Sequence, residues 1–205
     1  LRQSLKQGRV AHSYLFCGPR GSGKTTTARI IAKAVNCLDP QDGDPCNACE
    51  PCQTINSGQY MDIIDLDAAS NRGIEEIRVS REEVNFAPAQ GQRKVYIIDE
   101  AHMLTEAASN AFLKTLEEPP PHVIFILCTT DAHKILPTII SRCQRFDFRR
   151  ISNEHVIDRL AELCGAEEID CAPEVLAVIA RAAWGSLRDA ENILEQLAIS
   201  YATEG

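Results

Sequence analysis

A run near the start of the chain has the composition and spacing of a phosphate-binding loop. Gly18-Pro-Arg-Gly-Ser-Gly-Lys-Thr25 fits G-x-x-x-x-G-K-[ST] and stands between an apolar run and a helical pattern. Such glycines let main-chain N–H groups surround a phosphate, while the lysine bridges the β- and γ-phosphates and the threonine holds Mg²⁺. An ordinary glycine-rich turn is the alternative, which the flanking strand and helix disfavour. The predicted contact residues are Gly18, Pro19, Arg20, Gly21, Ser22, Gly23, Lys24, Thr25 and Thr26.

An apolar run at 95–98 ends in two acidic residues. Asp99 follows the run directly, so its carboxylate can hold Mg²⁺ beside a phosphate-binding loop. Glu100 then stands where a base could orient and deprotonate an attacking water. A solvated strand end is the alternative interpretation. We expect His102 to form local hydrogen bonds rather than to act in catalysis.

Four other residues carry groups that could join such a site, although their local sequence says little. Thr129 and Thr130 close the next apolar run, where a hydroxyl could detect a γ-phosphate or hold the water. Threonine at a strand end is usually structural. Arg142 precedes the last apolar run and Arg188 opens a helical pattern; for an arbitrary arginine a surface position is the default.

Four cysteines follow shortly after the loop, with the spacing C-x8-C-x2-C-x2-C, in a segment rich in Asp, Asn, Pro and Gly. Four thiolates at this spacing can surround one tetrahedral Zn²⁺ with no open position. A closed site is structural, because it orders a loop that is too polar to make its own core. We predict a zinc module at 37–52 with the ligands Cys37, Cys46, Cys49 and Cys52.

The chain has nine cysteines altogether. No secretion signal precedes the first apolar run, and no apolar run is long enough to span a membrane. With a phosphate-binding loop present, free thiols in the cytoplasm are favoured over disulfides. We expect the cysteines outside the cluster to be buried small hydrophobic residues, namely Cys17, Cys128, Cys143, Cys164 and Cys171.

The charge of the chain is distributed unevenly. Of 205 residues with a net charge of −8, residues 1–150 contain 18 basic and 18 acidic side chains, and residues 151–205 contain 3 and 11. This shift predicts a domain boundary near Arg150. A pI of about 5.2 disfavours a protein that coats nucleic acid by charge alone. Because the chain begins at Leu1, we expect it to be a piece of a longer protein.

The hydrophobic pattern predicts an α/β fold. Helical patterns at 25–35 and 106–116 alternate with short apolar runs, which indicates a doubly wound parallel sheet covered on both faces. The expected strands lie at 14–17, 61–66, 95–98 and 123–128, and a more alternating run at 143–148 predicts an edge strand. After Arg150 three helical patterns predict a small helical domain, in which Pro173 opens the second helix and Ser186 caps the third.

Taken together, these residues resemble the γ/τ motor subunits of bacterial DNA polymerase III clamp loaders, which are AAA+ ATPases. The resemblance covers essentially the whole chain. It implies a P-loop NTPase domain at 1–150, with a five-stranded parallel sheet and the zinc insert, and a helical lid at 151–205. Its distinctive marks are the four-cysteine insert, Ala68-Ala-Ser-Asn-Arg-Gly73, Leu113-Lys-Thr-Leu-Glu-Glu-Pro-Pro120 and Ser141-Arg-Cys143.

The resemblance also implies roles for the residues left open above. Arg142 matches an arginine finger that reaches the ATP of the neighbouring subunit, and such fingers are worth about 10³–10⁵ in rate. Arg188 matches the lid arginine that senses nucleotide in its own subunit, and Thr130, rather than Thr129, matches the strand-end sensor.

The implied activity is ATP-driven loading of the ring-shaped sliding clamp onto primer-template DNA. It would take place in a hetero-oligomeric ring of clamp-loader subunits within the DNA polymerase III holoenzyme, with ATP, Mg²⁺ and Zn²⁺ as cofactors and no polymerase chemistry in this chain. The family's segments before Leu1 and after Gly205 lie outside the chain, so we expect this piece alone neither to form the ring nor to hydrolyse ATP well.

Two other functions stay open at the level of sequence. A non-hydrolysing structural subunit of the same machine would keep the fold and the zinc module but not the intact Lys24, Thr25, Asp99 and Glu100. A small-molecule P-loop kinase would have no use for Arg142 at a subunit edge. Separately, three arginines could touch DNA phosphates, although Glu75 and Glu82 make an ion-paired surface an equal alternative; they are Arg72, Arg78 and Arg81.

Overall fold

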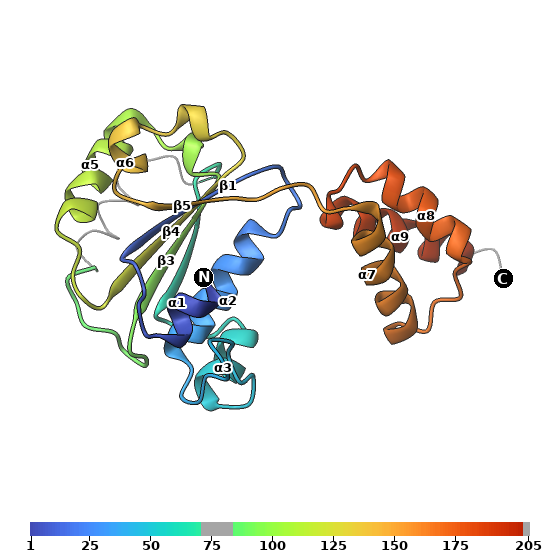
Figure 1. Cartoon of the computed structure of the whole chain (residues 1–205), viewed down its shortest axis with the longest axis horizontal. Helices are drawn as coiled ribbons and strands as arrows, with labels where there is room; N and C mark the ends of the chain where they lie inside the picture. Colours follow the sequence, from blue (N-terminus) through green and yellow to red (C-terminus); the bar gives the residue numbers. More distant parts are fainter. Residues whose placement is uncertain (71–83, 203–205) are drawn as a thin grey trace. The chain divides into compact units, whose positions relative to one another are not determined.

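The computed structural model describes residues 1–70 and 84–202, and for residues 201 and 202 the backbone alone. Contacts divide the chain into two compact units (Figure 1). The first contains Leu1–Cys17 and Lys24–Asp147, and the second contains Gly18–Gly23 and Phe148–Gly205. The charged residues considered above for DNA contact, and part of the Ala68–Gly73 motif, lie outside the described residues; they are Asn71, Arg72, Gly73, Glu75, Arg78, Arg81 and Glu82.

The first unit is built around a sheet whose strands are all parallel, in the order β2-β3-β4-β1-β5. The predicted five-stranded parallel sheet is therefore confirmed, and β5 lies at an edge as expected. In the described residues the strands are β1 (Ser13–Cys17), β2 (Ile63–Asp67), β3 (Lys94–Asp99), β4 (Val123–Thr129) and β5 (Gln144–Asp147). The helices of this unit are α1 (Arg2–Lys6), α2 (Lys24–Asn36), α3 (Glu50–Asn56), α5 (Glu106–Glu117) and α6 (Pro137–Ile140), with short 3₁₀ turns η1 (Ala101–Met103) and η2 (Ala132–Lys134).

The hydrophobic content of the strands agrees with their central and edge positions in the sheet. β1 and β4 are buried along their whole length, and β3 is buried except at its two ends, as expected for strands covered on both faces. β2 and β5 carry exposed polar side chains and take the two edges. Because β1, β3 and β4 are parallel strands in the middle of the sheet, their carboxyl ends lie at the same end of the sheet.

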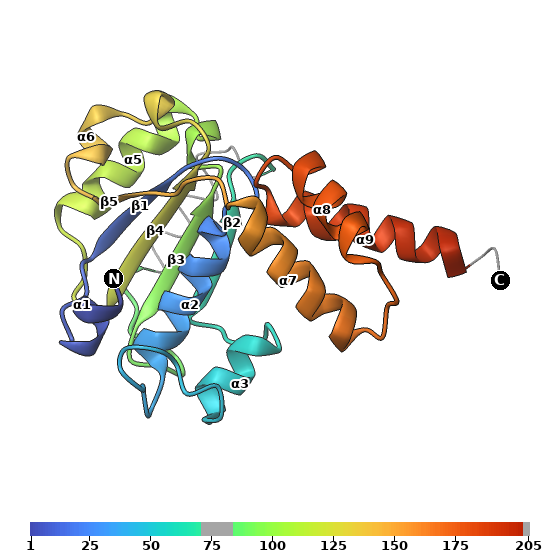
Figure 2. The ribbon, with the colours of Figure 1, turned by 45° about the vertical axis from the view of Figure 1, so that its right-hand side comes forward.

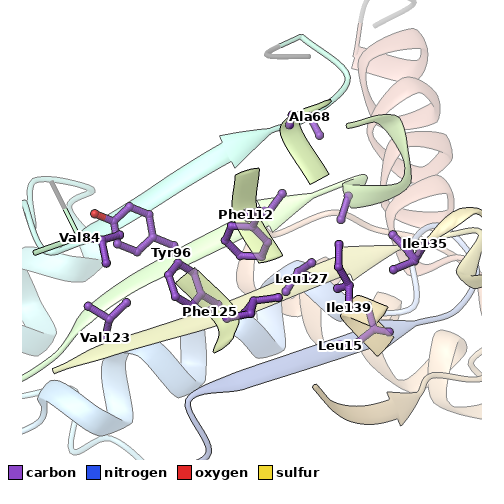
Figure 3. Close-up of a cluster of buried hydrophobic side chains, with 14 of the residues drawn as sticks. Leu15, Ala68, Val84, Tyr96, Phe112, Val123, Phe125, Leu127, Ile135 and Ile139 are labelled. Atoms are coloured by element: carbon purple, nitrogen blue, oxygen red, sulfur yellow. The ribbon is translucent and has the colours of Figure 1, made fainter. Parts of the chain in front are cut away.

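Helices cover both faces of this sheet. Figures 1 and 2 show α5 and α6 on one side and α2 on the other. On the α5 side, Phe112 packs edge-on against Phe125 with ring centroids 4.9 Å apart, and Tyr96 stacks on Phe125 at 5.4 Å (Figure 3). Alternate residues of β4 belong to this cluster. Because β4 is buried along its whole length, the residues between them are covered on the opposite face of the sheet.

The second unit contains three helices among its described residues, α7 (Asn153–Ala166), α8 (Pro173–Ala182) and α9 (Leu187–Ala202), as predicted for the region after Arg150. Their apolar faces share one core around Leu160, Ile179 and Leu194. Pro173 opens α8, and Ser186 accepts the N–H of Asp189 at the start of α9, so the predicted helix start and cap are both present.

Two expectations about cysteines were wrong. Cys17, Cys128 and Cys164 are buried, but Cys143 and Cys171 are only partly buried. Cys143 stands just before the edge strand β5 and Cys171 lies in the loop before α8, and each packs against the edge of a hydrophobic core. None of the helices in the described ranges is long and apolar enough to cross a membrane.

Candidate nucleotide and metal sites

The phosphate-loop glycines adopt the backbone that the motif requires. Gly21 and Gly23 have φ of +70° and +88°, values that residues with a side chain rarely adopt. A Cβ on Gly21 would also lie 2.0 Å from Oγ of Ser186, and the O of Gly21 accepts the N–H of Leu187 over 3.1 Å. Ser22 closes the turn by donating its hydroxyl to the O of Pro19 over 2.7 Å. The loop and the start of α9 are thus held together within the second unit.

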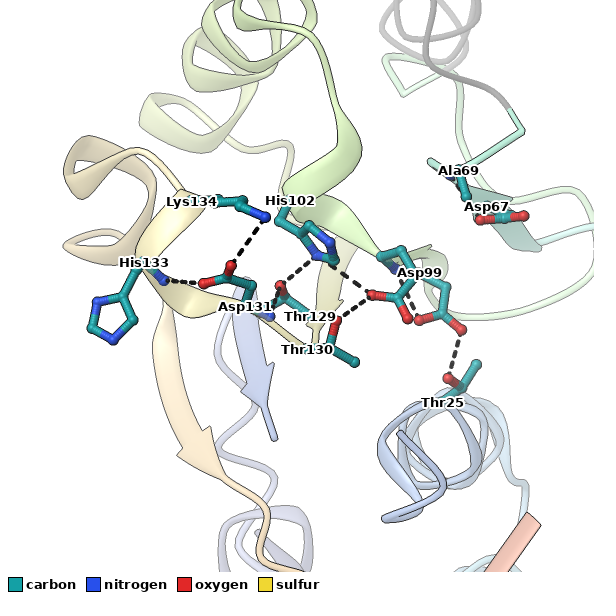
Figure 4. A network of polar contacts seen from close by, with 11 residues as sticks. Thr25, Asp67, Ala69, Asp99, His102, Thr129, Thr130, Asp131, His133 and Lys134 are labelled. Atoms are coloured by element: carbon teal, nitrogen blue, oxygen red, sulfur yellow. Dashed lines mark hydrogen bonds and ion pairs between the residues drawn. The ribbon is translucent and has the colours of Figure 1, made fainter. Parts of the chain in front are cut away.

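The residues that follow the loop begin helix α2 in the first unit. Lys24 is its first residue and is buried, and Thr25 comes next. Oγ1 of Thr25 donates to Oδ2 of Asp99 over 2.8 Å (Figure 4). The structure therefore brings together the two side chains that were predicted as magnesium ligands, from segments 74 residues apart in the sequence.

Asp99 ends β3, and Glu100 begins the following turn. Oδ1 of Asp99 accepts the main-chain N–H of Glu100 over 2.9 Å. Glu100 has the left-handed values φ 46° and ψ 44°, which cost a residue with a Cβ roughly 1–2 kcal/mol. Such strain occurs where packing imposes it, often at functional sites. The turn separates the two neighbouring carboxylates.

The end of β4 completes a polar network beside these acids. Thr130 donates its hydroxyl to Oε2 of Glu100 over 3.0 Å. Thr129 is buried, and its Oγ1 lies 3.0 Å from Nδ1 of His102, which in turn lies 3.4 Å from Oε2 of Glu100 (Figure 4). Asp131 adds its main-chain N–H to Oγ1 of Thr129 over 3.0 Å. His102 thus forms local hydrogen bonds, as expected.

The two predicted arginines are not part of this network. Arg142 donates to Oε1 of Glu117 and to the O of Thr138, both over 2.8 Å, on the side of the sheet where α5 and α6 lie. Arg188 is an exposed residue in the first turn of α9, in the second unit. Thr26 is exposed on α2 and Arg20 is exposed in the loop.

Sequence reasoning did not single out Glu117 as a partner of Arg142. Glu117 falls within the distinctive Leu113–Pro120 motif, but its pairing with a residue 25 positions away depends on how α5 and α6 pack. It likewise did not anticipate that Thr130 contacts Glu100, since the adjacency of β3 and β4 cannot be read from either strand alone.

The predicted zinc ligands converge in space. The Sγ atoms of Cys37, Cys46, Cys49 and Cys52 all lie within 4.8 Å of one another. Sulfurs around a tetrahedral Zn²⁺ with Zn–S bonds of about 2.3 Å stand roughly 3.8 Å apart, so the donor set fits this ion. Cys46 and Cys49 donate main-chain N–H groups to Sγ of Cys37 and of Cys46, each over 3.3 Å.

The thiols of this cluster have unequal environments. A hydrogen bond from the main chain of Leu38 lowers the pKa of Cys49 to about 6. Burial raises the pKa of Cys52 to about 12 and raises the pKa of Cys37. Since a metal ion must replace the protons of its thiol ligands, the buried sulfurs would be charged chiefly when an ion is bound.

Comparison with known proteins identifies the family. The sequence model described as "DNA polymerase III, delta subunit" matches residues 1–152, and that of a "DNA polymerase III clamp loader subunit, ATPase lid domain" matches residues 155–204. DNA polymerase III subunit tau of Bacillus subtilis is 52% identical over 98% of this chain and 36% of its own length. Subunit tau of Escherichia coli is 45% identical over 96% of this chain and 30% of its own length. The chain spans about a third of the length of these relatives.

Solved structures agree on the fold. A gamma subunit-related protein of DNA polymerase III from Thermotoga maritima is 25% identical, with a TM-score of 0.59 over 89% of this chain and 57% of its own. The RuvB Holliday junction branch migration motor of the same organism has a TM-score of 0.67, over 95% of this chain and 57% of its own. At 16% identity, this similarity concerns the fold alone. The first family model is described as a delta subunit, whereas the relatives are tau subunits. We assign the subunit type from the relatives, because their sequence identity extends over nearly the whole chain. This chain belongs to the gamma/tau clamp-loader subunits of DNA polymerase III and comprises their N-terminal ATPase and lid domains.

Proposed function

We propose that this chain is the ATP-hydrolysing motor part of a clamp-loader subunit. The observation that carries the proposal is the 2.8 Å contact between Thr25 and Asp99, because this hydroxyl and this carboxylate are close enough to share one Mg²⁺. Lys24, at the start of α2, would hold the β- and γ-phosphates. When bound, the magnesium ion would supply charge neutralisation between phosphate oxygens.

Two residues at the carboxyl ends of neighbouring strands act on the attacking water in this proposal. Glu100 accepts its proton and orients it toward the γ-phosphorus. Thr130, whose hydroxyl already reaches Glu100, would contact the γ-phosphate or the water. The loop residues 20–23 would donate main-chain N–H groups to the phosphates, and Arg188 of the lid would respond to the bound nucleotide. Arg142 would complete the site of a neighbouring subunit in trans.

We further propose that hydrolysis loads a sliding clamp onto primer-template DNA, in a hetero-oligomeric ring with other clamp-loader subunits. The match of residues 155–204 to the lid domain of a DNA polymerase III clamp loader subunit supports this. Residues 1–150 have no net charge, which suits DNA shared among several subunits rather than held by one. A role in replication places the protein in the cytoplasm.

The four cysteines would hold one structural Zn²⁺ in this proposal. Helix α2 separates them from the phosphate loop, and its 13 residues correspond to about 20 Å. A closed set of thiolates offers no open position to a substrate at that distance. The ion would therefore order the module at 37–52 and take no part in hydrolysis.

Substitution of the loop lysine tests the motor function. In the full subunit, assembled with its partner subunits, Lys24→Ala should abolish DNA- and clamp-stimulated ATP hydrolysis, because the β- and γ-phosphates lose their principal cation. Lys33→Ala, on the same helix, is the control and should leave hydrolysis unchanged. Unchanged hydrolysis in Lys24→Ala would overturn the proposal and favour a structural subunit that does not hydrolyse ATP.

A further inference from the structure

Among the described residues, the side chains of Thr130 and His102 contact the carboxylate of Glu100. Thr130 donates its hydroxyl to Oε2 over 3.0 Å, and Nδ1 of His102 lies 3.4 Å from the same oxygen. The backbone of Glu100 is left-handed, with φ of 46°, so its side chain starts from a direction that the turn imposes. The position of the carboxylate then depends on these two neighbours.

The hydroxyl of Thr130 cannot donate to Glu100 and to a phosphate oxygen at the same time. A threonine hydroxyl has a single hydrogen to donate. While Thr130 donates to Glu100, it cannot donate to a phosphate oxygen, which is the role proposed for it above. When Thr130 turns to the phosphate, His102 is the neighbour that can still hold the carboxylate.

The contacts of His102 determine which of its ring nitrogens carries hydrogen. Ionised Glu100 can only accept a hydrogen bond, so the approach of Nδ1 is attractive when Nδ1 carries the hydrogen. Oγ1 of Thr129, 3.0 Å from Nδ1, accepts the N–H of Asp131 and has room for a second hydrogen. In the tautomer that carries its hydrogen on Nδ1, this hydrogen lies between Oγ1 of Thr129 and Oε2 of Glu100. The ring is 10% exposed, so water competes little for this hydrogen.

We propose that His102 is the positioning residue for the base Glu100. Its Nδ1–H links the carboxylate to Thr129, at the end of β4, and keeps it in place when the adjacent Thr130 engages the phosphate. Because Thr129 and Thr130 are consecutive, the same strand end would present one hydroxyl to the phosphate and anchor the histidine with the other. This inference rests on the proposed ATPase function, and it gives His102 a role that its type and place in the sequence did not indicate.

Steady-state ATP hydrolysis by the full subunit in its assembled complex tests the proposal. His102→Ala should lower kcat roughly 10- to 100-fold, the scale expected for a misplaced catalytic group, with KM for ATP within about twofold. His102→Asn should recover most of kcat, because the asparagine amide can place an N–H close to the position of Nδ1–H. His133→Ala is the matched control, because His133 lies nearby and is exposed (Figure 4). Its main-chain N–H donates to Oδ1 of Asp131, and alanine keeps that N–H, so kcat should not change.

Three results would overturn the inference. One is an unchanged kcat in His102→Ala. Another is a His102→Asn variant as slow as His102→Ala with an unchanged melting temperature, since a donor at that position would then not matter. The third is a fall in melting temperature that accounts for the lost activity of both variants, which indicates a purely structural role. If the unmodified complex hydrolyses no ATP, the proposed function itself fails, and this outcome is distinguishable because it appears before any substitution.

Discussion

At the scale of single residues, the pair Asp99 and Glu100 shows how two neighbouring acids come to do different things. Oδ2 of Asp99 accepts a hydrogen bond from Thr25 and Oδ1 accepts one from the N–H of Glu100, so hydrogen bonds hold both carboxylate oxygens in place. Glu100 is turned away by its left-handed backbone and meets Thr130 instead. Composition alone would make the two carboxylates equivalent. Their different hydrogen bonds agree with the roles proposed for them, a metal ligand for Asp99 and a base for Glu100.

A third acid in the same unit has a structural role that can be tested. Asp62 is 1% exposed, and its carboxylate accepts the main-chain N–H groups of Ala89, Gln90 and Gly91 over 2.7–2.8 Å. Asp62→Ala leaves these three N–H groups without their acceptor. The free energy of unfolding, measured by urea denaturation, should therefore fall by about 3 kcal/mol or more. Asp158→Ala, at an exposed position of α7, should change it by less than about 0.5 kcal/mol. A loss below about 1 kcal/mol for Asp62→Ala would contradict this account.

At the scale of elements, the cysteine module is an insert at the far end of α2 that also contacts the first helix. Arg2 forms an ion pair with Asp44, and Lys6 forms one with Asp42. Between these two acids, Gly43 has φ of +89°, and a Cβ there would lie 2.5 Å from the O of Arg2. The tip of the module is therefore shaped to fit α1. Exposed ion pairs contribute about 0–1 kcal/mol each, so the order of the module has to come mainly from the thiolate site.

Metal content provides the corresponding test. Freshly purified, reduced protein should contain one zinc ion per chain by elemental analysis, and Cys52→Ser should lose it because a closed four-thiolate site loses a ligand. Cys171→Ser, which alters a partly buried thiol outside the cluster, should retain the ion. Removal of the ion by a chelator should increase amide hydrogen exchange at 37–52. A metal-free protein, or unchanged exchange after chelation, would contradict the zinc site.

At the scale of the whole molecule, Arg142 indicates a dependence on assembly. Its ion pair with Glu117 has side chains 34% and 51% exposed, and such a pair contributes about 0–1 kcal/mol. An arginine finger is worth about 10³–10⁵ in rate, or roughly 4–7 kcal/mol. If Arg142 acts as the proposed finger, the contact seen in the single chain can be given up at little cost in the assembled ring.

The complex should show this trans effect directly. Arg142→Ala should spare ATP binding by its own subunit and abolish hydrolysis at the adjoining site, as measured in complexes that contain one variant subunit at a defined position. Arg159→Ala removes another exposed, ion-paired arginine, on α7, and should not alter hydrolysis. Loss of binding affinity without loss of turnover would argue against a finger.

Much of this molecule was predictable from short patterns. The five strands, the helices after Arg150 and the convergence of the four cysteines were predicted, because burial periodicity and metal-ligand spacing are local properties. The partial exposure of Cys143 and Cys171 was not predicted, since it depends on which residues of other elements pack against them. The division into domains at 1–150 and 151–205 stays a prediction, although the compact units separate close by, at Asp147 and Phe148.

The sequence by itself determined the chemical groups of the proposed site and the kind of element that carries each of them. Tertiary structure decided which groups meet. The strand order places β3 between β2 and β4, and this adjacency puts Glu100 beside Thr130 and His102 beside Thr129, across 30 and 27 residues of chain. Several orders of five parallel strands would satisfy the same hydrophobic pattern, because each buried strand needs only neighbours and covered faces. The contacts that position the base therefore arise when the sheet forms, from packing between segments that are distant in the sequence.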